Sequence, residues 1–323
     1  MPILSVSDLT KWEKERLIVD DISFTQTDGE KIAIAGETGS GKSSLMKMIG
    51  GLVQPSSGEI RFNNRKVIGP LDQLMPGHPG VAYLGQHFEL RNNYFVDDLL
   101  DYGSELTVEE AANLYEVCSI THLLRRKTND GLSGGERQRI ALAKLLSRKP
   151  KLLLLDEPFS NLDILHKQTT RAVVNEISER LLCNIIMVSH DPLDILSWAS
   201  TVIILKDGRM IQKGSPQEVY RQPIDSYCAG LLGEYNLIPA SGKWEQLFAK
   251  LSIDQNPLVV RPESFTISTA GTGLPCIVKR VVYYGSYYIL EVLADDQMIR
   301  VRTNDPHFKE GDHLNLELNN TAF

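Results

Sequence analysis

A glycine-rich run near the N-terminus has the composition of a loop that holds phosphates. Residues 36–43 read GETGSGKS, which matches the pattern G-x-x-x-x-G-K-S. Glycines let successive backbone N–H groups wrap a polyphosphate, and a helix that begins here adds positive partial charge. Lys42 is placed to reach the β- and γ-phosphates, and the Ser43 hydroxyl is a suitable ligand for Mg²⁺. The run therefore predicts a nucleotide-binding site.

Two adjacent carboxylates follow an apolar run of strand length. Lys151–Leu155 precedes Asp156 and Glu157, so both acids lie at the carboxyl end of a predicted strand, where α/β sheets bind ligands. Asp156 is placed to hold Mg²⁺, directly or through water, and Glu157 to polarise an attacking water. Acids after a strand more often belong to a turn or a helix cap. The phosphate-binding run earlier in the chain favours the catalytic interpretation.

A third segment, residues 132–139, reads LSGGERQR at the start of a predicted helix. Ser133 and Glu136 are good capping residues by themselves, and two adjacent glycines expose N–H donors to an anion. The full string is nevertheless specific, and with the two segments above the chain resembles the ATP-binding-cassette ATPases over about residues 3–230. The resemblance implies a P-loop cassette that binds ATP with Mg²⁺ and hydrolyses it.

The same resemblance assigns roles to residues outside these segments. Gln86 resembles the glutamine that contacts Mg²⁺ and water, and His190 resembles the switch histidine that contacts the γ-phosphate. Ser160–Asp163 looks like the loop that crosses the dimer interface. Trp12 stands where the family places an aromatic residue that stacks on adenine, although tyrosine is more usual there. A lone strand-end histidine or N-terminal tryptophan is more often structural, so these roles depend on the register with the other motifs.

These roles give three expected sets of site residues. Glu157, His190 and Gln86 are expected to be catalytic, and Ser43, Gln86 and Asp156 are expected to hold the metal. The residues expected to bind the nucleotide are Trp12, Gly36, Glu37, Thr38, Gly39, Ser40, Gly41, Lys42, Ser43, Ser44, Ser133, Gly134, Gly135, Glu136 and Asp163.

The resemblance also implies partners. Two copies of the chain would pair head to tail, with the phosphate loop of one copy facing Ser133–Gly135 of the other, because neither motif alone encloses the γ-phosphate. An importer would add transmembrane permease subunits and an extracytoplasmic solute-binding protein, and this chain would lie peripherally at the cytoplasmic side of the membrane. Three alternatives stay open: a soluble cassette ATPase acting on DNA or ribosomes, the ATPase of an exporter, and a nucleotide sensor that does not hydrolyse. The short interval between motifs, the single cassette and the intact Glu157 and His190 favour the transporter.

The last third of the chain has the pattern of a small β domain. Leu314, Leu316 and Leu318 alternate with polar residues, as short strands do. The segment resembles the transport-associated OB-like domain of importer ATPases for sugars, polyamines, ferric iron and oxyanions, and the tail as a whole favours polyamine or ferric iron. Four tyrosines in residues 283–288 suggest a base-stacking platform instead. Acids outnumber bases in residues 225–323, so no nucleic-acid partner is expected.

The pattern of apolar runs predicts an α/β cassette with a mixed, largely parallel sheet, followed by an all-β OB-like domain. Residues 1–235 form the cassette, with an inserted helical subdomain at about 87–132, and residues 240–323 form a regulatory domain. Ile3–Gln26 is expected to form an antiparallel meander. The predicted strands are Lys31–Ala35, Gly80–Leu84, Lys151–Leu155, Asn184–Ser189 and Thr201–Leu205. The predicted helices are Ser43–Gly50, Glu136–Ser147, Lys167–Leu182 and Pro192–Ala199.

Composition sets the remaining limits. The chain has 323 residues, a formal net charge of −7 and 42% apolar residues, which is typical of a globular protein with two domains. The longest apolar run is too short for a membrane span, and the N-terminus lacks the pattern of a signal peptide. The four cysteines are too far apart in sequence to suggest a zinc site, which favours a reducing compartment. The expectation is a chain that is soluble in the cytoplasm.

Overall fold

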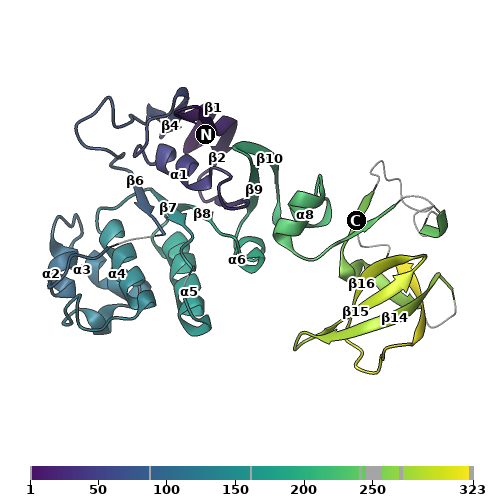
Figure 1. Cartoon of the computed structure of the whole chain (residues 1–323). Helices are drawn as coiled ribbons and strands as arrows, with labels where there is room; N and C mark the ends of the chain where they lie inside the picture. The colour runs from purple at the N-terminus through teal and green to yellow at the C-terminus, as the bar shows by residue number, and fades with distance from the viewer. Residues whose placement is uncertain are drawn as a thin grey trace. The chain divides into compact units, whose positions relative to one another are not determined.

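The computed structural model describes residues 2–86, 89–160, 162–239, 242–244, 257–268 and 272–319. The chain divides into two compact units, residues 1–216 and residues 217–323 (Figure 1). The domain boundary expected from the sequence, at residues 235–240, falls inside the second of these units.

The first unit is built on a six-stranded sheet with the order β10-β9-β3-β8-β7-β6. All neighbouring strands are parallel except β9 and β10. The five predicted strands are confirmed to within one residue at each end, and β10 is an addition. The strands are β3 (Lys31–Ala35), β6 (Val81–Leu84), β7 (Leu152–Asp156), β8 (Asn184–Val188), β9 (Thr201–Lys206) and β10 (Arg209–Gly214).

Helices cover both faces of this sheet, which explains why β7 and β8 are apolar along nearly their whole length. Leu152 and Leu154 pack with α1 (Lys42–Ile49) in one core, while Leu153 and Leu155 pack with the helices of the opposite face in another. The helices on that opposite face are α4 (Gly134–Leu146) and α5 (Ile164–Arg180). The predicted helices are confirmed, and α6 (Pro192–Leu196) is shorter than expected.

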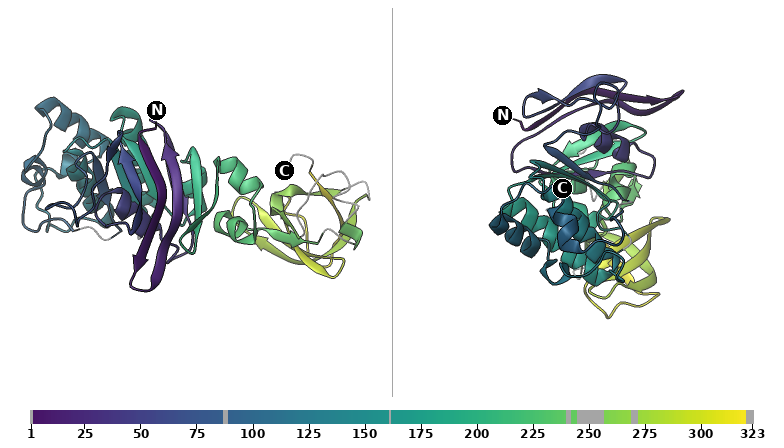
Figure 2. Two further views of the ribbon diagram at one scale, coloured as in Figure 1. Left: turned by 90° about the horizontal axis from the view of Figure 1, so that it is seen from above. Right: turned by 90° about the vertical axis from the view of Figure 1, so that its left-hand side faces the viewer.

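A second, antiparallel sheet with the order β2-β1-β4-β5 joins the α1 side of the unit. In the left view of Figure 2 its long purple strands lie beside the strands of the parallel sheet, and the Asp20 N–H donates to the Gly208 carbonyl at 2.9 Å. The expected meander is confirmed as β1 and β2. The strands are β1 (Leu4–Glu13), β2 (Arg16–Gln26), β4 (Ser57–Phe62) and β5 (Arg65–Lys66).

Short helices between β6 and α4 form the expected helical subdomain, and Figure 1 shows them gathered beside α4. A capping box of Thr107 and Glu110 starts the longest of them, which satisfies backbone donors of its first turn. The sequence pattern missed the first helix because six residues are too few to show a helical period. The elements are α2 (Val96–Asp101), α3 (Val108–Val117) and the 3₁₀ turn η1 (Thr121–Leu123).

The second unit contains an antiparallel five-stranded sheet with the order β13-β17-β14-β15-β16 and a two-stranded sheet of β11 and β12. The alternating leucines of the last strand face one core, with Leu316 fully buried, as predicted. The helical elements are α7 (Pro216–Arg221), α8 (Ser226–Leu232), η2 (Gly242–Trp244) and η3 (Pro262–Ser264). The strands are β11 (Asn236–Ile238), β12 (Leu258–Val260), β13 (Phe265–Ser268), β14 (Leu274–Tyr283), β15 (Tyr288–Ala294), β16 (Gln297–Thr303) and β17 (His313–Leu318).

One buried arginine explains why α8 and most of α7 belong to the second unit. The Arg261 guanidinium donates to the carbonyls of Ala229 and Gly233 at the end of α8, at 3.0 and 3.1 Å. It also donates to the Tyr220 carbonyl of α7 at 3.0 and 3.1 Å, and lies 4.1 Å from the centre of the Tyr220 ring. Because a buried guanidinium needs partners for all its donors, these contacts bind the two helices to the β domain.

Candidate functional site

The glycine-rich run forms a tight loop between β3 and α1. A Cβ atom on Gly36 would lie 2.3 Å from the Leu205 carbonyl oxygen. Gly41, which precedes α1 with a φ of 96°, would place a Cβ 2.5 Å from the Ile18 carbonyl oxygen. Both positions therefore require glycine, for close backbone approach at the first and for a left-handed conformation at the second as well. Glu37, Thr38 and Gly39 are exposed, so the loop faces outward.

Lys42 is held at the centre of this loop. Its ammonium donates to the Gly36 and Glu37 carbonyls at 2.8 and 2.7 Å, and the residue is only 7% exposed. Burial lowers the pKa of Lys42, while the carboxylates of Glu157 and Asp156 act in the opposite direction. The lysine thus carries its charge into a desolvated loop next to the two predicted acids, where an anion gains more from it than in water.

Asp156 is the last residue of β7 and is 4% exposed. Its Oδ2 accepts a hydrogen bond of 2.9 Å from the Tyr83 hydroxyl of β6, a partner that sequence reasoning missed. Ser43 and Ser44 lie in the first turn of α1. Carboxylate and hydroxyl oxygens are the donors that Mg²⁺ prefers, so the residue types fit this metal. Among the described residues no three His, Cys, Asp or Glu side chains form a metal site, so phosphate and water oxygens would have to complete the coordination.

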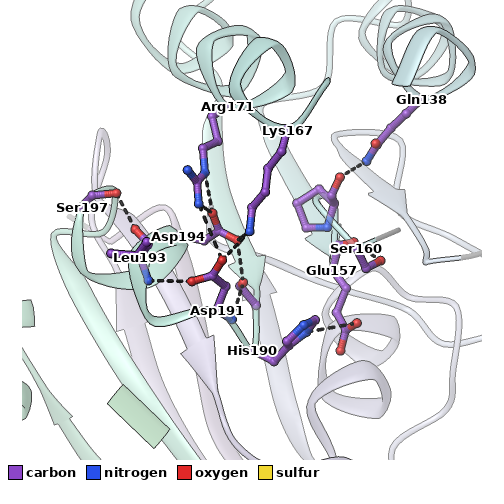
Figure 3. Close-up of polar contacts among 12 residues, drawn as sticks. Gln138, Glu157, Ser160, Lys167, Arg171, His190, Asp191, Leu193, Asp194 and Ser197 are labelled. Carbon is purple, nitrogen blue, oxygen red and sulfur yellow. Dashed lines mark hydrogen bonds and ion pairs between the residues drawn. The ribbon is translucent and has the colours of Figure 1, made fainter. Parts of the chain in front are cut away.

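The three residues predicted to be catalytic come together at the carboxyl end of the sheet. Gln86 Nε2 donates to Glu157 Oε2 at 3.3 Å, and His190 Nδ1 lies 3.5 Å from the same oxygen (Figure 3). Each residue follows a different parallel strand, so strand order alone brings them into contact. Glu157 has a φ of 52°, a strained conformation for a residue with a side chain. Such strain is typical of functional sites.

A group of ion pairs flanks His190. Asp194 is 2% exposed and accepts hydrogen bonds from Arg171 Nε at 2.5 Å and from the Ser189 hydroxyl at 3.2 Å. Lys167 pairs with Asp194 at 3.1 Å and also with Asp191, as Figure 3 shows. The network ties α5 to the residues on both sides of the histidine. Sequence reasoning missed it, although two cations four residues apart on a helix indicate that both point the same way.

The replacement Asp194→Asn is expected to lower the free energy of unfolding by about 3 kcal/mol, because it leaves two partly buried cations short of a counter-charge. Denaturant unfolding followed by circular dichroism measures the effect. The matched control is Glu176→Gln, which removes a solvent-exposed pair with Arg180 on the same helix and should change stability little. Equal losses in the two variants would contradict a stabilising role of the buried network.

The remaining predicted nucleotide residues form a second group at the starts of α4 and α5. The Ser133 hydroxyl accepts from the Glu136 N–H at 3.2 Å, and Glu136 accepts from the Ser133 N–H at 2.7 Å, a complete capping box. A Cβ on Gly135 would lie 2.9 Å from the His166 ring. Asp163 caps α5 and accepts from His166 Nδ1 or its N–H, and these hydrogen bonds lower the pKa of Asp163. The two helix starts therefore lie side by side.

Two further expectations have limited support in the geometry. Trp12 lies on β1 opposite Leu17 and is 48% exposed, so its ring is partly available to a ligand. Asn161, in the segment expected to cross a dimer interface, lies outside the described residues. In the part of the chain that the structure describes, no helix has the length and hydropathy needed to cross a bilayer.

Comparison with known proteins adds families and relatives to this geometry. Residues 19–160 match the family described as ABC transporter, and residues 258–322 match the TOBE domain. The chain is 32% identical over 331 residues to the glucose import ATP-binding protein GlcV of Saccharolobus solfataricus, covering 94% of this chain and 92% of that protein. It is 28% identical to the Fe(3+) ions import ATP-binding protein FbpC of Escherichia coli O157:H7, covering 98% and 95%. It is 30% identical to the putrescine transport ATP-binding protein PotG of Escherichia coli K12, covering 95% and 88%.

Among solved structures, cbiO1 from Clostridium perfringens, described as part of the ABC transporter complex cbiONQ, has the same fold. The TM-score is 0.61 at 28% identity, and the match covers 68% of this chain and 91% of that one.

Proposed function

The chain belongs to the ABC transporter ATPases that carry a C-terminal TOBE domain, and we propose that it powers solute import through separate membrane subunits. As a member of this family it binds and hydrolyses ATP. The observation that carries the proposal is the meeting of Gln86, Glu157 and His190 beside the phosphate loop, in a chain whose relatives of nearly equal length are import ATPases.

The residues of the first group divide the reaction between them. Backbone N–H groups of residues 36–43 and the Lys42 ammonium bind the ATP phosphates. Ser43, Asp156 and Gln86 hold Mg²⁺, which neutralises charge on the phosphates when bound. Glu157 accepts the proton of the attacking water or orients it. His190, beside the same carboxylate oxygen, contacts the γ-phosphate side of the site.

The second group completes the site of a partner copy. The start of α4 at Ser133–Gly135 presents backbone N–H groups that bind anions, and Asp163 lies beside it. A head-to-tail dimer places this group of one copy against the phosphate loop of the other, which removes water from the γ-phosphate. ATP binding then closes the dimer and hydrolysis opens it. Trp12 supplies a stacking surface for the adenine.

A hollow beside Gln86 supports contact with a membrane subunit. Its volume is about 380 Å³, and it is lined mainly by apolar side chains of the helical subdomain together with β6. Leu90, Leu99 and Leu145 line its apolar wall, and Tyr83 closes the side nearest Asp156. We infer that a cytoplasmic segment of the membrane subunit docks here, which would place the chain peripherally at the cytoplasmic side of the membrane with an extracytoplasmic solute-binding protein beyond it.

The solute follows from likeness alone. The relatives include ATPases named for Fe(3+), putrescine and glucose, at 28–32% identity. We propose ferric iron or a polyamine as the solute, and we assign the C-terminal β domain, residues 240–323, to regulation rather than to the chemistry of ATP.

The test is transport by the assembled complex. The tagged chain is expected to copurify with membrane subunits from detergent-solubilised membranes of its own source. Reconstituted in proteoliposomes with a solute-binding protein, the complex should take up one of ⁵⁵Fe³⁺, labelled putrescine or labelled glucose only when ATP is present. Recovery of the tagged chain without any membrane protein, together with full ATPase activity, would contradict the transport proposal and favour a soluble ATPase.

A further inference from the structure

Tyr83 touches both the metal site and the surface that surrounds the proposed docking hollow. Its hydroxyl donates to Asp156 Oδ2 at 2.9 Å. Its ring lines the hollow described above and also a neighbouring one, formed by residues of α1's C-terminal turn, the β5–β6 connection and the helical subdomain. The residue is half-buried, so the hydroxyl end lies inside while part of the ring faces solvent.

The sheet dictates this contact. β6 pairs in parallel with β7, and Tyr83 lies opposite Leu154, two residues before Asp156. Because side chains alternate along a strand, Leu154 and Asp156 share one face, which is the α1 face. Tyr83 packs against the same core. The tyrosine ring therefore has only one strand spacing to cross before its hydroxyl reaches the carboxylate.

Gly85 makes room for the ring. A Cβ on Gly85 would lie 3.2 Å from the tyrosine Cε1 and 3.4 Å from its hydroxyl oxygen, closer than ordinary contact allows. Gly85 itself lines the hollow. A group pressed against this position from the hollow side would thus move the hydroxyl that Asp156 accepts.

We propose that Tyr83 is a positioning residue that orients Asp156 for Mg²⁺ and transmits occupation of the hollow to the metal site. The inference rests on the proposed function, in which Asp156 holds the metal and a membrane subunit fills the hollow. The hydroxyl hydrogen bond to Oδ2 fixes the rotation of the carboxylate and leaves Oδ1 available to a ligand. Burial and the nearby Asp156 raise the pKa of Tyr83, so the hydroxyl keeps its proton and remains a donor at every physiological pH.

The first test removes the hydroxyl and keeps the ring. Full-length Tyr83→Phe is titrated with the fluorescent nucleotide trinitrophenyl-ATP at increasing MgCl₂ and, separately, in EDTA. The Mg²⁺ concentration that gives half of the metal-dependent signal is expected to rise about tenfold, as for loss of a partner that orients a metal ligand. Affinity in EDTA should not change. The matched control is Tyr115→Phe, since Tyr115 also donates to a carboxylate, Asp101, but far from the site in sequence and chemistry.

The second test acts from the hollow side. Gly85→Ala should raise the Mg²⁺ requirement in the wild-type background and leave it unchanged in the Tyr83→Phe background, because the methyl group acts through the hydroxyl. Additive effects of the two substitutions would overturn transmission through Tyr83. An unchanged requirement in Tyr83→Phe would overturn the positioning role, and if that variant does not fold, an unchanged requirement in Gly85→Ala does so instead.

The same titration separates this inference from the function on which it rests. Wild-type chain that shows no Mg²⁺ dependence, or Asp156→Asn that keeps all of it, refutes the metal assignment of Asp156. A wild-type response that Asp156→Asn abolishes and Tyr83→Phe preserves refutes the role of Tyr83 alone.

Discussion

Replacement of Glu157 by glutamine is expected to lower the kcat of ATP hydrolysis by about 100- to 1000-fold, the range for loss of a general base. The substitution keeps the size of the side chain and its contact distance to Gln86, but removes the proton acceptor. ATP binding should be retained, because the phosphate loop and Asp156 are unchanged. Phosphate release under saturating ATP measures the loss, and nucleotide titration measures the binding.

A second readout follows from the proposed dimer. With hydrolysis blocked, ATP should hold Glu157→Gln in a closed dimer that elutes earlier in size-exclusion chromatography than the wild-type chain under the same conditions. Glu179→Gln is the matched control, since Glu179 is exposed and reaches only Lys31, at 3.9 Å. Normal turnover in Glu157→Gln would remove this residue from the catalytic role and turn attention to His190.

Replacement of Lys42 by alanine is expected to weaken ATP binding by about 100-fold, since charge-assisted hydrogen bonds to two phosphates are lost. The loss is large because the lysine is buried and already held toward the loop by the Gly36 and Glu37 carbonyls, so little ordering is needed when the ligand arrives. Titration with a fluorescent nucleotide measures it.

The control for Lys42→Ala is Lys47→Ala, which removes an exposed ammonium from the last turn of the same helix. Its ATP affinity should match that of the wild-type chain. Unchanged affinity in Lys42→Ala would mean that the glycine-rich loop binds phosphate through its backbone alone, and the assigned role of the lysine would be wrong.

Local pattern was sufficient for most of the cassette. Apolar runs predicted β3, β7 and β8 because a strand covered on both faces needs apolar residues at every position. The phosphate loop was predictable because each glycine answers a steric demand of the backbone, as Gly36 and Gly41 show. Elements of six residues or fewer, such as α2 and α6, were missed or misjudged in length since they hold less than two helical turns.

Side-chain partners across strands were beyond the reach of pattern. Tyr83 and Asp156 are separated by β6, the helical subdomain and α4 in the sequence, and the contact exists because β6 and β7 are neighbours in the parallel sheet. The same holds for Lys167, whose partners follow β8. Strand order is a property of the whole chain, so no window of sequence contains it.

By itself, the sequence determined the chemistry: the phosphate loop, the acids after β7 and the helix start at Ser133 each follow from residues close together in the chain. The tertiary structure decided how these parts connect. It joined Gln86, Glu157 and His190 around one carboxylate, and it assigned α8 to the C-terminal unit through the buried guanidinium of Arg261. The physical reason is that backbone propensity and capping act over a few residues, whereas buried polar groups take their partners from whichever segments the fold brings within hydrogen-bonding distance.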